Sequence, residues 1–89
     1  MLPHDHQNEL VKILRTEGFT LSEESDPTWQ LIFWSFHDEN KLEIKIITNL
    51  PQPFISIRLN GHVVLNDQPD DFHALKKVIN KFFSKYFEE

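Results

Sequence analysis

The side chains of this sequence best suited to chemistry are histidines and neighbouring carboxylates. His4 and His6 flank Asp5, which places two imidazoles and a carboxylate, all common zinc ligands, within three residues. The pair of histidines has no further strong ligand placed at metal-binding spacing in the sequence and lies near a chain end, where segments are usually mobile. We therefore expect no metal site in this segment.

The other histidines and the paired acids do not form a catalytic set. His37, His62 and His73 fall at expected turns or at a helix start, without a partnered nucleophile. Catalytic acids need burial to shift their pKa, whereas the adjacent acids here fall in a loop, at a helix start and at the end of the sequence. These pairs are Glu23–Glu24, Asp70–Asp71 and Glu88–Glu89. The sequence therefore predicts neither an enzyme nor a bound cofactor.

Aromatic side chains are concentrated in the most apolar run of the chain, residues 29–37 (WQLIFWSFH). Its aromatic and β-branched content favours a strand, in which side chains alternate between the two faces of a sheet. Leu31 and Phe33 would lie on one face, and Ile32, Trp34 and Phe36 on the other. A strand with one solvated face should be apolar on one side only, so this strand predicts a sheet with two apolar faces.

The next segment, residues 42–48, alternates more regularly and predicts the second strand of a hairpin. The join is Asp38–Lys41, in which Asn40 suits a left-handed conformation. With His37 opposite Leu42, Trp34 would lie opposite Lys45 and could make a cation–π contact worth about 0.5–1 kcal/mol.

A second hairpin is predicted over residues 54–65. Asn60-Gly61 separates two apolar runs, and this pair is typical of a two-residue hairpin turn because both residues tolerate positive φ. Such a turn pairs Leu59 with His62 and Ile57 with Val64. Residues expected on the outer face are Phe54, Ser56, Arg58, Val63 and Leu65.

Two amphipathic helices flank these strands. The first is predicted over residues 5–17, with Asp5 as N-cap and Gly18 as the left-handed residue that ends it. The last follows Pro69, which suits a first helical position, and carries an apolar stripe from Phe72 to Tyr86. Residues 20–22 could add a short strand at the edge of the sheet.

The order of elements predicts an α+β fold: a helix, a four-stranded antiparallel meander and a helix, with both helices packed on one face of the sheet. Two helices can cover one sheet face only. The other face would expose Ile32, Trp34, Phe36, Ile47, Phe54, Val63 and Leu65, with Glu43, Lys45 and Arg58 at its rim. Apolar patches of this size usually mark contact sites. Coverage by the loop 20–28 or by residues 83–87 is the alternative.

Composition narrows the class of protein. The 89 residues are expected to form a single domain, 1–89. The absence of cysteine excludes disulfide scaffolds and thiolate zinc sites, and no apolar run is long enough to span a membrane. No signal peptide is apparent, and we expect a cytoplasmic protein. The formal net charge of −5 disfavours nucleic acid as a partner.

The element order resembles that of the double-stranded RNA-binding domain, which implies lysines at the start of the second helix to hold phosphates. Here that position carries Asp67, Asp70 and Asp71, of the opposite charge.

These observations predict a small protein-binding module, of an adaptor, inhibitor or immunity type, that binds an unidentified protein or itself as a homodimer through the sheet. Single-stranded nucleic-acid binding by base stacking, and binding of a small molecule, are the alternatives. A group of acidic residues could meet a basic partner, or imitate phosphate charges toward a nucleic-acid enzyme: Glu23, Glu24, Asp26, Asp38 and Glu39. The expected partner-binding residues are Ile32, Trp34, Phe36, Lys45, Phe54 and Arg58.

Overall fold

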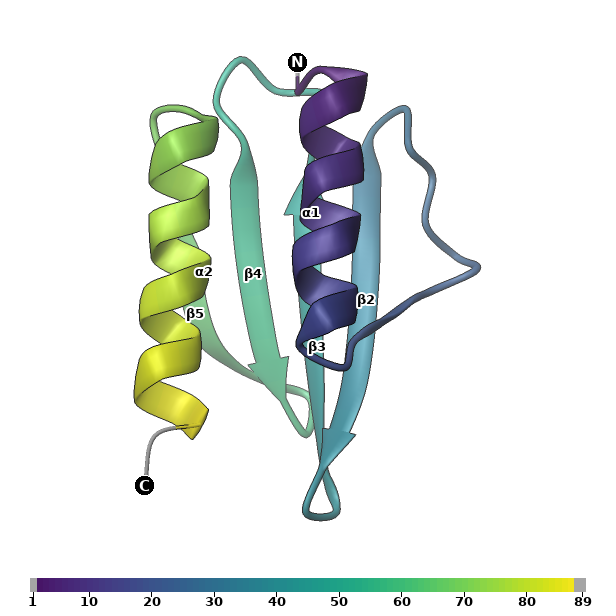
Figure 1. The fold of residues 1–89 in the computed structure, drawn as a ribbon, viewed down its shortest axis with the longest axis vertical. Coiled ribbons are helices and arrows are strands. Elements are labelled where there is room, and N and C mark those ends of the chain that lie inside the picture. The colour runs from purple at the N-terminus through teal and green to yellow at the C-terminus, as the bar shows by residue number, and fades with distance from the viewer. Residues whose placement is uncertain (1, 88–89) are drawn as a thin grey trace.

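The computed structural model describes residues 2–87, which form two helices and a five-stranded antiparallel sheet (Figure 1). The elements in chain order are α1 (His4–Thr16), β1 (Thr20–Leu21), β2 (Gln30–His37), β3 (Asn40–Ile47), β4 (Phe54–Leu59), β5 (His62–Asp67) and α2 (Phe72–Phe87). The predicted α+β class with an antiparallel sheet is confirmed. The predicted number of four strands is wrong, because the short segment β1 pairs with β2 and adds a fifth.

Helix α1 ends as its sequence predicts but begins differently. Gly18 has a φ of 91°, and the Phe19 N–H donates to the Leu14 carbonyl at 2.9 Å, which closes the helix in a Schellman motif. At the other end Pro3, not Asp5, is the N-cap residue, and no side chain caps the helix. Asp5 lies instead in the first turn, where a carboxylate stabilises the positive end of the helix dipole.

Helix α2 begins at Phe72 and is capped by the residue before it. The Asp71 carboxylate accepts a hydrogen bond from the Ala74 N–H at 2.8 Å, the contact expected of an aspartate N-cap. Pro69 therefore lies in the loop before the helix, where it is buried, and the prediction that it occupies the first helical position is wrong.

The hairpin of β2 and β3 is tighter than predicted. Asp38 and Glu39 form a two-residue turn with φ values of 52° and 71°, so these residues adopt the left-handed conformation expected of Asn40. The register consequently shifts by two: Ser35 lies opposite Leu42, and Trp34 lies opposite Glu43 instead of Lys45. A shift of two residues preserves the face of every side chain, because the strand period is also two.

The hairpin of β4 and β5 turns at Asn60-Gly61 as predicted, with φ values of 52° and 85°. Leu59 pairs with His62, but the register then shifts at a bulge, so that Ile57 pairs with Leu65 and not with Val64. Leu65 consequently packs against the core instead of joining the outer face, which corrects the prediction. Val64, expected in the core, is 48% exposed.

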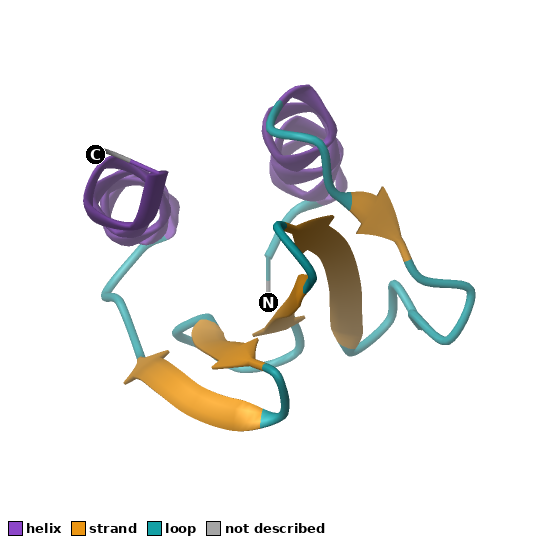
Figure 2. Cartoon of the chain, turned by 90° about the horizontal axis from the view of Figure 1, so that it is seen from below, coloured by secondary structure: helices purple, strands orange, loops and turns teal. Residues whose placement is uncertain are grey.

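The sheet is curved, and Figure 2 shows both helices on its concave side. The buried residues of the sheet alternate along β2, β3 and β4 and form one cluster with residues of both helices. The two helices contact each other where His6 stacks on Phe72, with ring centroids 4.1 Å apart. Phe19, which follows α1, stacks on Phe83 of α2 at 5.6 Å. The fully buried members of the cluster are Leu10, Leu14, Phe33, Leu42, Ile44, Ile46, Ile55, Ile57, Leu75 and Ile79.

Helices α1 and α2 are too short and too polar to be candidate membrane spans, and none of the described residues belongs to such a span.

Candidate functional site

The face of the sheet that points away from the core, here called the outer face, carries the six predicted partner-binding residues on three strands. Register places Ile32 beside Lys45 and Ser56, and places Trp34 beside Glu43 and Arg58. Further members of the outer face are Phe36 and Lys41 at one end, and Ile47 and Phe54 at the other. The six predicted residues therefore lie on one face of the sheet, but they do not form one contiguous cluster.

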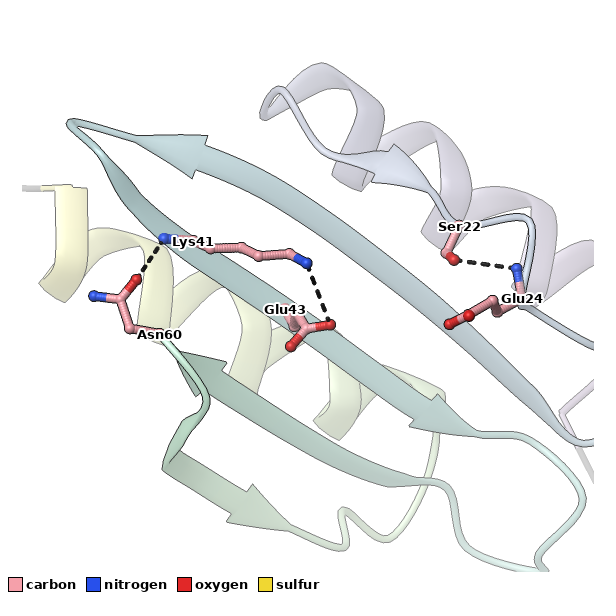
Figure 3. A network of polar contacts seen from close by, with 5 residues as sticks. All are labelled: Ser22, Glu24, Lys41, Glu43 and Asn60. Carbon is pink, nitrogen blue, oxygen red and sulfur yellow. Dashed lines mark hydrogen bonds and ion pairs between the residues drawn. The ribbon is translucent and has the colours of Figure 1, made fainter.

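Charged side chains extend from one end of the outer face into its middle. Lys41 and Glu43 on β3 approach within 4.0 Å (Figure 3), and Arg58 lies across from Glu43 on β4. A shallow depression of about 50 Å³ lies here, lined by Ile32, Glu43, Lys45, Ser56 and Arg58. The structure thus brings together three predicted residues, Ile32, Lys45 and Arg58, in a mixed-charge setting.

The aromatic side chains of the outer face lie beside this charged middle. Trp34 and Phe36 make an edge-on contact with ring centroids 5.8 Å apart, and Phe36 is 64% exposed. Trp34, Ile32 and Phe54 are instead largely covered within the chain, so the exposed apolar patch is smaller than predicted. Phe54 lies level with Ile47, about 20 Å along β3 from the level of Phe36, since six residues of strand separate the two positions.

The second hairpin turn is tied to the first by the polar side chain at its tip. The Asn60 side-chain oxygen accepts from the Lys41 N–H at 2.9 Å (Figure 3), and its amide nitrogen donates to the Asn40 side chain at 2.9 Å. The Asn60 N–H also donates to the Lys41 carbonyl at 2.8 Å. These contacts fix the end of the outer face that carries Phe36 and Lys41.

A groove between β5 and α2 was not predicted from the sequence. It has a volume of about 520 Å³ and is lined by Val64, Leu65, Asp67, Val78, Lys81, Phe82, Lys85 and Tyr86. The bulge at Val64 opens it, and a bulge leaves no clear mark in a sequence. The available signal was the unbroken apolar run Val63–Leu65 on the last strand, which departs from simple alternation.

The acidic residues do not form one patch. Asp26 bridges to Gln30 at the start of β2, whereas Asp38 and Glu39 follow the end of β2, about 25 Å away along an eight-residue strand. Asp26 is exposed, and hydrogen bonds from the Thr28 hydroxyl and the Thr28 N–H hold the pKa of its carboxyl below the usual range.

Of the two histidines near the N-terminus, His6 packs against an aromatic ring and His4 does not. His6 lies flat on the Phe72 ring, with its Nδ1 buried and unpaired, and His4 is exposed. Among residues 2–87 no group of three potential metal ligands is present.

Comparisons with family models, with curated proteins and with solved structures gave no match to this chain.

Proposed function

We propose that this protein is a binding module, of an adaptor, inhibitor or immunity type, that recognises another protein through the outer face of its sheet. The observation that carries the proposal is the exposure of Phe36, at 64%, in edge contact with Trp34. Aromatic side chains with an apolar ring held against a rigid strand are typical of the energetic centres of interfaces. Packing of both helices on the other face leaves this surface available.

The charges beside the aromatic pair favour a protein as partner. Glu43 lies between Lys41 and Arg58, so the outer face presents both signs within a short distance. Charges of both signs beside an apolar anchor fix the orientation of a protein partner. A nucleic-acid strand would instead require a consistently basic path, and a base-stacking platform would require more than one widely exposed ring. The depression at the centre is also far smaller than the roughly 300–1,000 Å³ of ordinary ligand pockets.

The proposal is for binding without catalysis, and we place it in the cytoplasm because a cysteine-free chain suits a reducing compartment. Self-association through the same face is the second candidate. It is favoured by the presence of both charge signs, which lets one copy of the face oppose another in a twofold arrangement.

Site-specific cross-linking tests the proposal. A photoreactive phenylalanine analogue replaces Phe36, and the matched control carries it at His73, an exposed position on α2. In cells that produce the protein, we expect one discrete adduct from position 36 and none from position 73. An adduct of twice the monomer mass, together with a dimer in sedimentation equilibrium, would assign the face to self-association.

The purified partner then serves in a binding titration with Phe36→Ser. We expect about a tenfold or greater loss of affinity, since truncation of an interface anchor costs more than about 1.4 kcal/mol. Urea unfolding of the variant should be close to that of the parent, because the replaced side chain is largely exposed. Equal adducts from both positions, or unchanged affinity, would refute the proposal.

A further inference from the structure

Strand β5 forms one edge of the sheet, with β4 as its only neighbour in the strand order of the described residues. Its sequence, HVVLND, contains neither lysine nor proline, the residues that most often protect an edge from further pairing. Val63 and Val64 are 49% and 48% exposed. The bulge at Val64 is the one protective device here, and the groove described above lies directly beside it.

The wall of the groove opposite β5 is a regular surface of α2. Val78, Phe82 and Tyr86 follow one another at spacings of four, so they form a single apolar row along the helix. Phe82 and Tyr86 stack with ring centroids 5.6 Å apart, which keeps this row flat. An edge strand beside a helix with an apolar row is the arrangement that accepts an extended peptide as an added strand.

The charged residues that line the groove determine which charges a bound peptide should carry. Lys81 and Lys85, both exposed, form a second row at the rim of the groove, and Asp67 is the one acid that lines it. Because β5 and α2 run in opposite directions, Asp67 lies toward the start of α2 and Lys85 toward its end. A strand added antiparallel to β5 would therefore begin near Asp67 and end near Lys85.

We propose that the groove between β5 and α2 binds an extended segment of a partner protein, with apolar residues at alternate positions and acidic residues toward its C-terminal end. The segment pairs with the backbone of β5, its apolar side chains lie against Phe82 and Tyr86, and its carboxylates meet Lys81 and Lys85. This site is separate from the outer face.

A second copy of the chain suits the groove less well. A twofold pairing of β5 with β5 places both α2 helices on the same side of the joined sheet, on either side of the symmetry axis. The side chains of the second β5 that point to this side, such as Leu65, already pack against their own core, so they are not free to lie against Phe82 and Tyr86 of the other copy.

The test is selection from a phage-displayed library of random dodecapeptides against the full chain. The selected peptides are synthesised and titrated against three proteins: the parent, the doubly substituted Lys81→Glu/Lys85→Glu, and the control Lys77→Glu. Lys77 is exposed on α2 but does not line the groove, so the control matches the change in residue type at another site.

We expect peptides with alternating apolar residues and acids near the C-terminal end. Lys81→Glu/Lys85→Glu should weaken them by about tenfold or more, and Lys77→Glu by much less. Bound peptide should also slow hydrogen exchange of β5 amides. N-methylation of alternate peptide bonds should abolish binding, since it removes strand pairing. Failure to enrich any peptide, selection of basic peptides, or equal binding to all three proteins would overturn the proposal. So would a concentration-dependent dimer that Val64→Asp abolishes, because a second copy would then occupy the edge.

Discussion

The two edges of the sheet differ: the edge at β2 is covered by the segment that precedes it, and the edge at β5 is open. At the β2 edge, Thr20 and Leu21 pair with Trp34 and Phe33, and the loop that follows continues the cover. The Ser25 hydroxyl accepts from the Ile32 N–H at 2.8 Å and donates to its carbonyl at 3.1 Å, and Asp26 bridges to Gln30. At the opposite edge, β5 pairs with β4 on one side only within the described part of the chain, and its bulged residue Val64 has no partner in the register.

This difference shows that the edge at β2 is protected from pairing with a further strand, whereas the edge at β5 is open to it. Unpaired strand edges are templates for association, and most proteins cover or charge them. Here a loop supplies the missing backbone partners of β2 with side chains and main chain, although it forms only two residues of strand. The uncovered edge is also the one beside a groove, which is why we assign binding of an added strand to it.

The largest expected effect on the free energy of unfolding comes from truncating Phe19, which holds β1 at the covered edge of the sheet. Phe19, 3% exposed, leads into β1 and stacks on Phe83. Phe19→Ala should lower the free energy of unfolding by about 3–5 kcal/mol, because the site would lose buried apolar surface and retain a cavity. Val64→Ala at the open edge should lower it by less than about 1 kcal/mol, since this side chain is half exposed. Urea unfolding checks both, and similar losses would contradict the contrast between the edges.

A smaller effect is expected from the polar cover of β2. Ser25→Ala removes both hydroxyl contacts with Ile32 and should lower the free energy of unfolding by about 1–2 kcal/mol. Hydrogen exchange of the Ile32 amide should accelerate as well. Ser84→Ala, on the exposed side of α2, is the matched control and should change neither quantity. An unaltered Ile32 exchange rate in Ser25→Ala would show that the loop does not protect this edge.

The two hairpin turns allow a change in the stabilising direction. Glu39 has a φ of 71°, a conformation that disfavours side chains with a Cβ, so Glu39→Gly should raise the free energy of unfolding by about 0.5–1 kcal/mol. Gly61→Ala, at a φ of 85°, should lower it by a similar amount. Both are measured by urea unfolding, and destabilisation by Glu39→Gly would contradict a strained turn.

The smallest effect concerns the loop that covers β2. The Thr28 hydroxyl and N–H hold the pKa of Asp26 below its ordinary value, and an NMR titration of the Asp26 carboxyl should detect this. Because the pKa is lower in the folded state, the associated stability is present above the unfolded-state pKa and is lost as the pH falls through the folded-state pKa. Thr28→Val removes the hydroxyl donor and should return the pKa part of the way. No upward movement would contradict this cause.

Much of the architecture was predictable because its signals are local. Gly18 ends α1 and Asn60-Gly61 turns the second hairpin, since each has the positive φ that its residue type favours. The register of β2 and β3 was not predictable: alternation repeats every two residues, so a shift of two leaves the pattern intact, and Asp38-Glu39 is not a typical tight-turn pair.

The surface features were likewise predictable only where the sequence carries a local signal. Alternation placed Ile32, Trp34, Phe36, Lys45, Phe54 and Arg58 on one face, but it could not predict how far neighbouring strands cover them. The groove depends on the bulge at Val64, which reverses the roles expected of Val64 and Leu65. The closure of the β2 edge by Ser25 depends on contacts between side chain and backbone seven residues apart, which sequence periodicity does not contain.

The strand order β1-β2-β3-β4-β5 also determines the sequence in which the strands can pair during synthesis on the ribosome. Every strand has its partner next to it in the chain, so each hairpin can assemble as soon as it leaves the exit tunnel, and such short-range pairing favours rapid folding. The apolar core-facing side of β4 and β5 nevertheless remains exposed until the sixteen-residue helix α2 has been synthesised. A nascent chain stalled before Phe72 would therefore be the form most prone to aggregate.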